Sequence, residues 1–205
     1  LTDLRLSSTF HGRIATSRDD KLVTATAGSQ AIKGTYEINI ENIALAHRIA
    51  SDGEVGELTY DAGDEIINIT VGEGDNQKTT AITIKEGSDL TAIVQEINDS
   101  LVLESESTGT SNQIQLNGSK EFLVDQLKLG TGVDDEGNLM GMKPIQEAQD
   151  AAYSINGIPL ISESNTIKDA VQGVTFNLRD TGTAQITVKQ DVDQAVGKIR
   201  AFVDQ

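Results

Sequence analysis

Short runs in which apolar and polar residues alternate recur along almost the whole chain, and this pattern constrains the fold more than any other feature of the sequence. In residues 35–43, Tyr36, Ile38 and Ile40 fall on one face of an extended strand, while polar residues fall on the other. We therefore predict a mainly β fold of the α+β class, built from short antiparallel strands. The further predicted strands are residues 21–27, 57–60, 67–71, 80–84, 101–104, 113–116, 151–155, 158–161, 174–178 and 184–190.

The connections between these strands differ in how clearly they predict a turn. Asn156-Gly157 is the strongest hairpin signal in the chain. Residues 28–34 predict that the strands before and after them form a hairpin or lie side by side. Residues 130–141 combine glycines with acidic residues and predict a mobile loop. The slightly longer segment 130–143 is the best candidate for a junction between domains.

Two stretches change from strand spacing to helical spacing. Ser88 is a suitable N-cap, and the apolar residues after it predict a short helix packed on the middle strands; they are Leu90, Ile93, Val94 and Ile97. A second helical face is predicted near the C-terminus, formed by Val192, Ala195, Val196, Ile199, Phe202 and Val203. Residues 122–129 fit either spacing, and residues 167–171 predict a helical turn or a tight loop.

Composition excludes several classes of protein. The 205 residues contain no Cys, which excludes disulfides, Cys-ligated zinc, iron–sulfur clusters and a thiol nucleophile. With four Phe, three Tyr and no Trp, the core must be largely aliphatic. The formal charge of −16 argues against nucleic acid and anionic membranes as partners. No apolar run approaches the ~18 residues that span a membrane, and we expect a chain that starts at Leu1 without a signal peptide to be part of a longer protein.

No pattern in the chain predicts catalysis, a metal or a cofactor. His11 and His47 lack a zinc-binding partner, and we expect each to be exposed or half-buried. There is no Gly-x-Ser-x-Gly elbow, and the paired glycines of residues 72–74 and 130–132 lack the Lys and further Gly of a phosphate loop. The acidic residues 134–136 lack a calcium-loop register and predict a solvated loop. The chain is therefore not expected to be an enzyme.

Several segments resemble, in the same order along the chain, the sequence blocks of one family. The first spans residues 25–49 and includes Gly34-Thr35-Tyr36. The later blocks are residues 56–59, 83–98, 101–110, 148–158 with Ile155-Asn156-Gly157, and 164–178 with Ser164-Asn165 and Gly173-Val174-Thr175. Together these blocks resemble the flagellar hook-associated protein 2 family, the filament cap proteins.

The resemblance implies an architecture and a function. It implies a discontinuous β domain of residues 4–50 and 145–191, into which a second β domain of residues 51–144 with one helix is inserted. Residues 192–205 would begin a terminal helical stalk. It also implies a structural protein that is exported through the flagellar channel, caps the filament tip outside the cell and promotes flagellin assembly as an oligomer. The implied partners are flagellin and further copies of the chain, with no cofactor.

The expected interaction surface is the predicted C-terminal helical face, on Val196, Ile199, Phe202 and Val203. The alternative for these side chains is a place in the core of their own domain. An alternative function is also open at this stage, because exposed β domains at a filament tip suit a surface adhesin or a module that binds mucin-like host glycans.

Overall fold

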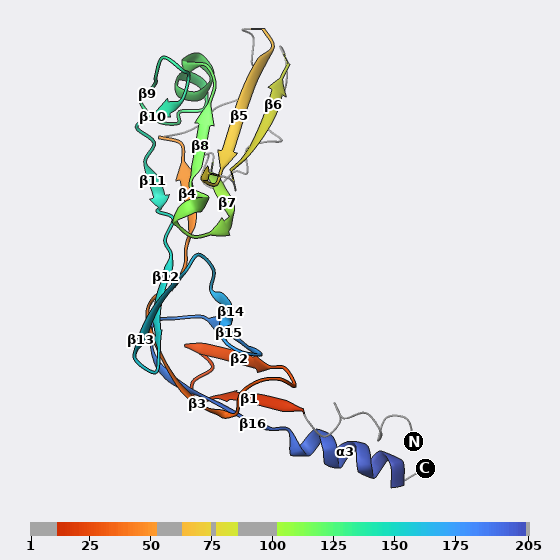
Figure 1. The fold of residues 1–205 in the computed structure, drawn as a ribbon. Helices are drawn as coiled ribbons and strands as arrows, with labels where there is room; N and C mark the ends of the chain where they lie inside the picture. The colour runs from red at the N-terminus through yellow and green to blue at the C-terminus, as the bar shows by residue number, and fades with distance from the viewer. Residues whose placement is uncertain (1–11, 53–62, 75–76, 86–101, 204–205) are drawn as a thin grey trace. The chain divides into compact units, whose positions relative to one another are not determined.

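The computed structural model describes residues 12–52, 63–74, 77–85 and 102–203. The chain divides into two compact units: unit 1 comprises residues 1–44 and 150–205, and unit 2 comprises residues 45–149. The strands of unit 1 are β1 (Arg13–Ser17), β2 (Val23–Ala27), β3 (Gly34–Asn42), β12 (Ala151–Ile155), β13 (Ile158–Ser162), β14 (Thr166–Val171), β15 (Val174–Leu178) and β16 (Gly182–Gln190), and a helix, α3 (Val192–Val203), follows them (Figure 1).

The described residues of unit 1 form two antiparallel sheets. Five strands lie in the order β1-β16-β3-β12-β13, and three lie in the order β14-β15-β2. The central strand β3 pairs with β12 on one side and β16 on the other, so that Ile38 lies opposite both Ile155 and Ala184. One apolar core joins the two sheets; its largest fully buried members are Phe176, Ile38, Ile186, Val23 and Val174.

Pairing in unit 1 corrects two of the expectations. Strands β2 and β3 are neither a hairpin nor neighbours, because β2 pairs with β15 in the other sheet. The connection between them is tied to that sheet, where the Gly28 N–H donates to the Gly173 carbonyl at 2.8 Å. Residues 167–171 form part of strand β14 rather than a helical turn or loop. Two extra residues bulge out of β14 between Ile167 and Val171, which disrupts the alternation in its sequence.

The hairpin predicted at Asn156-Gly157 is confirmed. Both residues have positive φ, 51° and 80°, as a two-residue hairpin turn requires. Ile155 lies opposite Ile158 in the resulting ladder. The Asn156 side chain also accepts a hydrogen bond from the Glu37 N–H at 2.9 Å, which joins the turn to β3.

The described part of unit 2 contains three small antiparallel sheets and two short helices. Its elements are β4 (Ala46–Ala50), β5 (Glu65–Val71), β6 (Lys78–Ile84), β7 (Val102–Thr108), the 3₁₀ helix η3 (Thr110–Asn112), β8 (Ile114–Asn117), the π-type helix η4 (Glu121–Gln126), β9 (Gly132–Val133), β10 (Leu139–Met140) and β11 (Pro144–Gln146). The sheets have the orders β11-β4-β7, β6-β5-β8 and β10-β9. Phe122, Leu123, Leu129 and Ile49 are among the buried residues of the core that they share.

The structure moves the expected domain boundaries. They were expected after residue 50 and before residue 145, which would place β4 and β11 in the outer domain. In the structure these two strands pair with each other, and β4 pairs with β7, so both belong to unit 2. Residues 130–143 lie wholly inside unit 2 and are not the junction. They contain the β9–β10 hairpin where a loop was expected.

Several other expectations concern unit 2. Residues 122–129, which fit two spacings, begin within η4. The helix expected after Ser88 and the strand at residues 57–60 lie outside the described residues, as does His11. His47 is only 5% exposed, so the expectation of a surface or half-buried residue was wrong. Its Nδ1 accepts a hydrogen bond from the Ile114 N–H at 3.0 Å, which satisfies this ring nitrogen inside the core.

Gly173 tests how closely the turn between β14 and β15 approaches the segment between β2 and β3. Its φ is +72°, and a Cβ there would lie 2.8 Å from the Ala31 nitrogen. Gly157 also has a positive φ, of +80°, but its Cβ would meet nothing within 4 Å. We expect Gly173→Ala to lower the free energy of unfolding by about 2–4 kcal/mol, because strain and a backbone clash add, and Gly157→Ala to cost only about 1 kcal/mol. Urea denaturation followed by circular dichroism measures both, and equal losses would contradict the close approach of Gly173 to Ala31.

Candidate assembly surfaces

The C-terminal helix α3 follows directly on the last strand of the larger sheet. The Asp191 N–H donates to the Gly12 carbonyl at 2.9 Å, so the β1–β16 ladder extends to the residue before the helix. In a helix, residues spaced by three, four or seven positions fall on one stripe. The stripe expected to make contacts is therefore attached to a strand whose position the sheet fixes.

Part of that apolar stripe is exposed in the structure. The exposed fraction is 40% for Val196 and 74% for Val203, and Val192 one turn earlier is 59% exposed. Ile199 and Phe202 lie in the helix, but their side chains lie outside what the structure describes. Val196 and Val203 are thus surface residues within residues 1–205. Their role in assembly stays a prediction.

Asn165, in the Ser164-Asn165 block of the sequence, holds the residue at which the chain leaves unit 1. The Ala44 N–H donates to Asn165 Oδ1 at 2.7 Å, and Asn165 Nδ2 donates to the Ala44 carbonyl at 2.8 Å. Ala44 lies just beyond β3, and the Asn165 side chain pairs with both of its backbone groups as a neighbouring strand would. Sequence reasoning marked Asn165 only through the family resemblance, since an Asn between two strands most often forms a turn.

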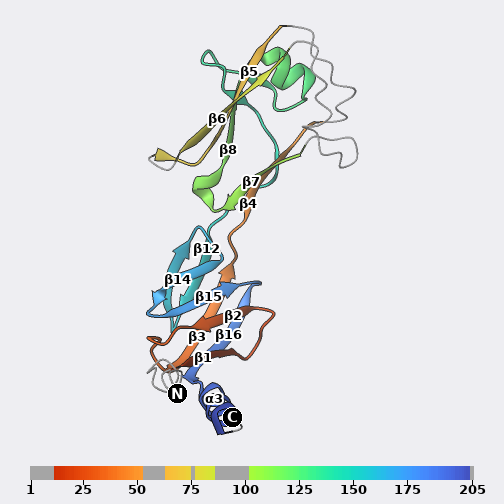
Figure 2. The ribbon, with the colours of Figure 1, turned by 90° about the vertical axis from the view of Figure 1, so that its right-hand side faces the viewer.

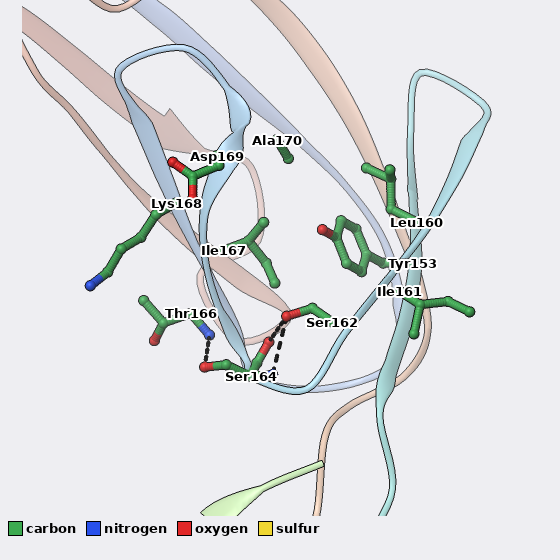
Figure 3. A pocket seen from close by; sticks show the side chains of 10 residues that line it. All are labelled: Tyr153, Leu160, Ile161, Ser162, Ser164, Thr166, Ile167, Lys168, Asp169 and Ala170. Atoms are coloured by element: carbon green, nitrogen blue, oxygen red, sulfur yellow. Dashed lines mark hydrogen bonds between the residues drawn. The ribbon is translucent and has the colours of Figure 1, made fainter. Parts of the chain in front are cut away.

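An open groove of about 690 Å³ lies between β13 and β14 in unit 1 (Figure 3). Ile167 and Tyr153 face each other across it, and burial raises the pKa of the Tyr153 phenol. Hydrogen bonds from Ser162 Oγ to the Ser164 carbonyl and from the Ser164 N–H back to Ser162 Oγ shape one end. The remaining lining residues are Leu160, Ile161, Thr166, Lys168, Asp169 and Ala170.

The lining of this groove combines aliphatic and hydroxyl-bearing side chains with one Lys and one Asp. Its charged residues are Lys168 and Asp169, whose charged ends point away from the apolar centre in Figure 3. The serines that line it are bonded to neighbouring backbone groups, and among the described residues no histidine lines it to activate them. Ile161, on the same edge, is 75% exposed. Periodicity placed Ile161 in a strand but gave no sign that it faces solvent.

The acidic turn at residues 134–136 is a local structural device. The Asp134 carboxylate accepts hydrogen bonds from the Asn138 side chain at 3.0 Å, the Asn138 N–H at 2.8 Å and the Glu136 N–H at 3.1 Å. The Asn138 side chain, followed by these backbone N–H groups, holds the pKa of Asp134 below its usual range. Across the described residues, no three His, Cys, Asp or Glu side chains gather in a way that could hold a metal ion.

The two units differ greatly in charge. Unit 1 carries 10 Lys and Arg against 12 Asp and Glu, whereas unit 2 carries 6 against 20. The net charges are therefore −2 and −14, so the inserted unit carries nearly all of the chain's −16. Among the helices that the structure describes, none is both long and apolar enough to cross a membrane.

Two family models match the chain, one at each end. The model described as "Flagellar hook-associated protein 2 N-terminus" matches residues 1–47, and the one described as "Flagellar hook-associated protein 2 C-terminus" matches residues 148–205. These two segments end within a few residues of the boundaries of unit 1. Unit 2 occupies the sequence between them.

Relatives with curated names agree with these models. An A-type flagellar hook-associated protein 2 of Pseudomonas aeruginosa is 24% identical over 100% of this chain and 48% of its own length. The flagellar hook-associated protein 2 of Salmonella typhimurium is 32% identical over 54% of this chain and 23% of its own length. The chain thus spans about half the length of the first of these relatives, 48%.

Solved structures share the fold. The D1-D2-D3 domains of the flagellar cap protein FliD from Escherichia coli match with a TM-score of 0.77 and 25% identity, covering 99% of this chain and 73% of that one. FliD (HAP2) from Pseudomonas aeruginosa PAO1 matches with a TM-score of 0.65 and 20% identity, covering 90% of this chain and 92% of that one, and shows the fold alone. These names give no support to the glycan-binding alternative.

Asn165 predicts a loss of stability. We expect Asn165→Ala to lower the free energy of unfolding by about 1–3 kcal/mol, because both backbone groups of Ala44 lose their partner. Asn165→Asp keeps the acceptor for the Ala44 N–H but sets a carboxylate oxygen against the Ala44 carbonyl, so it should cost at least as much as Asn165→Ala. Chemical denaturation at pH 7 measures both variants. A loss for Asn165→Asp clearly smaller than that for Asn165→Ala would show that the two bonds do not act as described.

Asp134 predicts a titration that can be followed directly. Because its pKa is lowered in the folded protein, its stabilising effect is complete above the ordinary Asp value of about 3.9 and is lost as the pH falls through the folded value. Carboxyl ¹³C NMR should give a midpoint below that ordinary value. Asn138→Ala removes the largest cause and should raise the midpoint towards it. An unchanged midpoint in Asn138→Ala would refute the role of this side chain.

Proposed function

The chain belongs to the flagellar hook-associated protein 2 family, and from this membership we propose that it forms the β head region of a flagellar filament cap. In this role it is exported through the flagellar channel and works outside the cell, at the filament tip. It acts as an oligomer and promotes the insertion of flagellin subunits. The proposed partners are therefore flagellin and further copies of the same protein.

One observation carries this proposal: the fold of the flagellar cap protein from Escherichia coli matches 99% of the chain, with a TM-score of 0.77. Family models at both ends of unit 1 give independent support from sequence. The hydrogen-bonding side chains described above fit a structural role, since they hold turns and strand ends together. We therefore propose a structural protein without catalytic activity.

The physical properties of the chain suit this role. A protein that passes through a narrow channel must travel unfolded, and a chain without cysteine cannot form disulfides that would obstruct it. An aliphatic core can reassemble outside without a cofactor. The exposed valines of α3 then offer an apolar stripe that a neighbouring copy can cover.

The test is filament growth with an altered helix stripe. In the full-length protein, Val196→Asp together with Val203→Asp should impair cap assembly and filament elongation, because burying two new carboxylates in an interface is costly. Both side chains are exposed in residues 1–205, so the unfolding free energy of this part should change by less than about 0.5 kcal/mol. The same pair of changes at Ile199 and Phe202 should have the same effect on assembly.

Ile158→Asp is the matched control, since Ile158 is 64% exposed in unit 1 and does not line the groove between β13 and β14. It should leave filament growth unchanged. Filaments of normal length with the doubly altered helix would remove α3 from the assembly surface. Turnover of a peptide or glycan substrate by the purified protein would overturn the structural role itself.

A further inference from the structure

Strand β6 (Lys78–Ile84) is an open edge of the β6-β5-β8 sheet in unit 2. No strand in the described part of the chain pairs with its outer side. Five of its seven residues are exposed: Lys78, Thr79, Thr80, Ala81 and Thr83. An edge of this kind presents a row of backbone N–H and C=O groups that can pair with another extended chain.

Most other sheet edges in the described chain carry a feature that hinders such pairing. Pro159 lies in β13, and Pro144 begins β11. Strand β14 bulges opposite β15, and β7 carries two carboxylates, Glu104 and Glu106, as well as an irregular register. In unit 1, the edge strands of the two sheets, β1 and β2, lie side by side in both views (Figures 1 and 2).

Strand β6 lacks these protections. All seven of its residues pair in unbroken register with β5, from Glu65↔Ile84 to Val71↔Lys78. Its sequence, Lys-Thr-Thr-Ala-Ile-Thr-Ile, contains no proline and no acidic residue, and its one charged side chain, Lys78, stands at the first position of the strand. The β-branched threonines and isoleucines also favour the extended conformation that an added strand requires.

The outer face of the same sheet is uncharged, although it belongs to the strongly acidic unit. The register places eight side chains on this face: Ile66, Asn68, Thr70, Thr79, Ala81, Thr83, Gln115 and Asn117. None of them is charged, and Ile66 is 57% exposed. Depletion of charge within a surface is typical of the centre of a protein interface.

The opposite face of β6 borders a groove of about 530 Å³. Lys78 and Thr80, which alternate along the strand, line it, and so does Glu106 of β7. The other lining residues are Ile69, Val71, Gln77, Ser107 and Asn112. A strand added along β6 would place every second side chain at this groove. Backbone pairing with a pocket for alternate side chains is how sheet edges recognise peptides.

Charge decides what kind of chain fits. A second copy would bring another unit of net charge −14 to the edge and would be repelled. Two charged residues line the groove, Lys78 of β6 and Glu106 of β7, so a basic side chain would be repelled near Lys78 and attracted to the Glu106 carboxylate on the β7 side. We propose that β6 is a strand-addition site for an extended, basic segment of a different protein, with one Lys or Arg directed at Glu106. This proposal does not depend on the role in the filament cap.

The first experiment uses two peptides and the ¹⁵N-labelled chain of residues 1–205. The probe is a nine-residue peptide that alternates Thr and Val and carries Lys at both ends and at its centre; its match replaces each Lys with Glu. We expect amide shifts to concentrate on residues 78–84 and around Glu106 with the basic peptide. The apparent affinity should be at least ten-fold weaker for the acidic peptide and should fall with added salt. No shifts at millimolar basic peptide, shifts away from β6, or equal effects of both peptides would overturn the proposal.

Variants separate the groove from the overall charge. Glu106→Gln should weaken binding of the basic peptide by about two- to five-fold, because one exposed charge pair is lost. Glu136→Gln makes the same change of charge at a residue that does not line the groove and should have less effect. Ala81→Lys with Thr83→Lys should weaken binding at least five-fold, with an unchanged unfolding midpoint to show that the strand remains folded. Equal effects of the two Glu variants would refute the position assigned to the basic side chain.

Discussion

The position of β3 between β12 and β16 is the constraint on which the rest of the structure depends. Ile38 pairs with Ile155 and Ala184, so the central strand of unit 1 finds its partners only after the whole of unit 2 has passed. Closing so long a loop costs conformational entropy, which the core around Phe176 and Ile186 must offset. Because α3 continues from β16, closure of this sheet also fixes where the C-terminal helix begins.

The net charge of the chain is divided unequally between the two units. The unit that both chain ends build is nearly neutral, whereas the inserted unit carries a net charge of −14. In the proposed oligomer, the inserted units of neighbouring copies would repel one another far more strongly than the nearly neutral units would. The overall charge of −16 is therefore best understood as a property of the inserted unit and of the partners that it accepts or rejects.

Strand alternation and the Asn156-Gly157 turn could be read directly from the sequence, because both depend on residues close together in the chain. The pairing of β2 with β15 could not be read, since alternation identifies a strand but not its partner. The bulge in β14 interrupts the alternation of apolar and polar residues there, and β9 and β10 are too short to show such alternation. Nothing in the sequence around His47 indicated that the Ile114 N–H would donate a hydrogen bond to its ring nitrogen in the core. Spacing predicted helix α3 but left open whether its valines face a partner or the core of their own domain.

The central proposal is that the exposed stripe of α3 needs further helical segments, outside residues 1–205, to form the assembly surface, so that residues 1–205 alone remain monomeric. Sedimentation equilibrium of residues 1–205 beside the full-length protein tests this claim most directly. We expect a mass of 21.9 kDa for residues 1–205 at micromolar concentration and a discrete larger oligomer for the full-length protein. The same oligomer in both samples, or a monomer in both, would contradict the account.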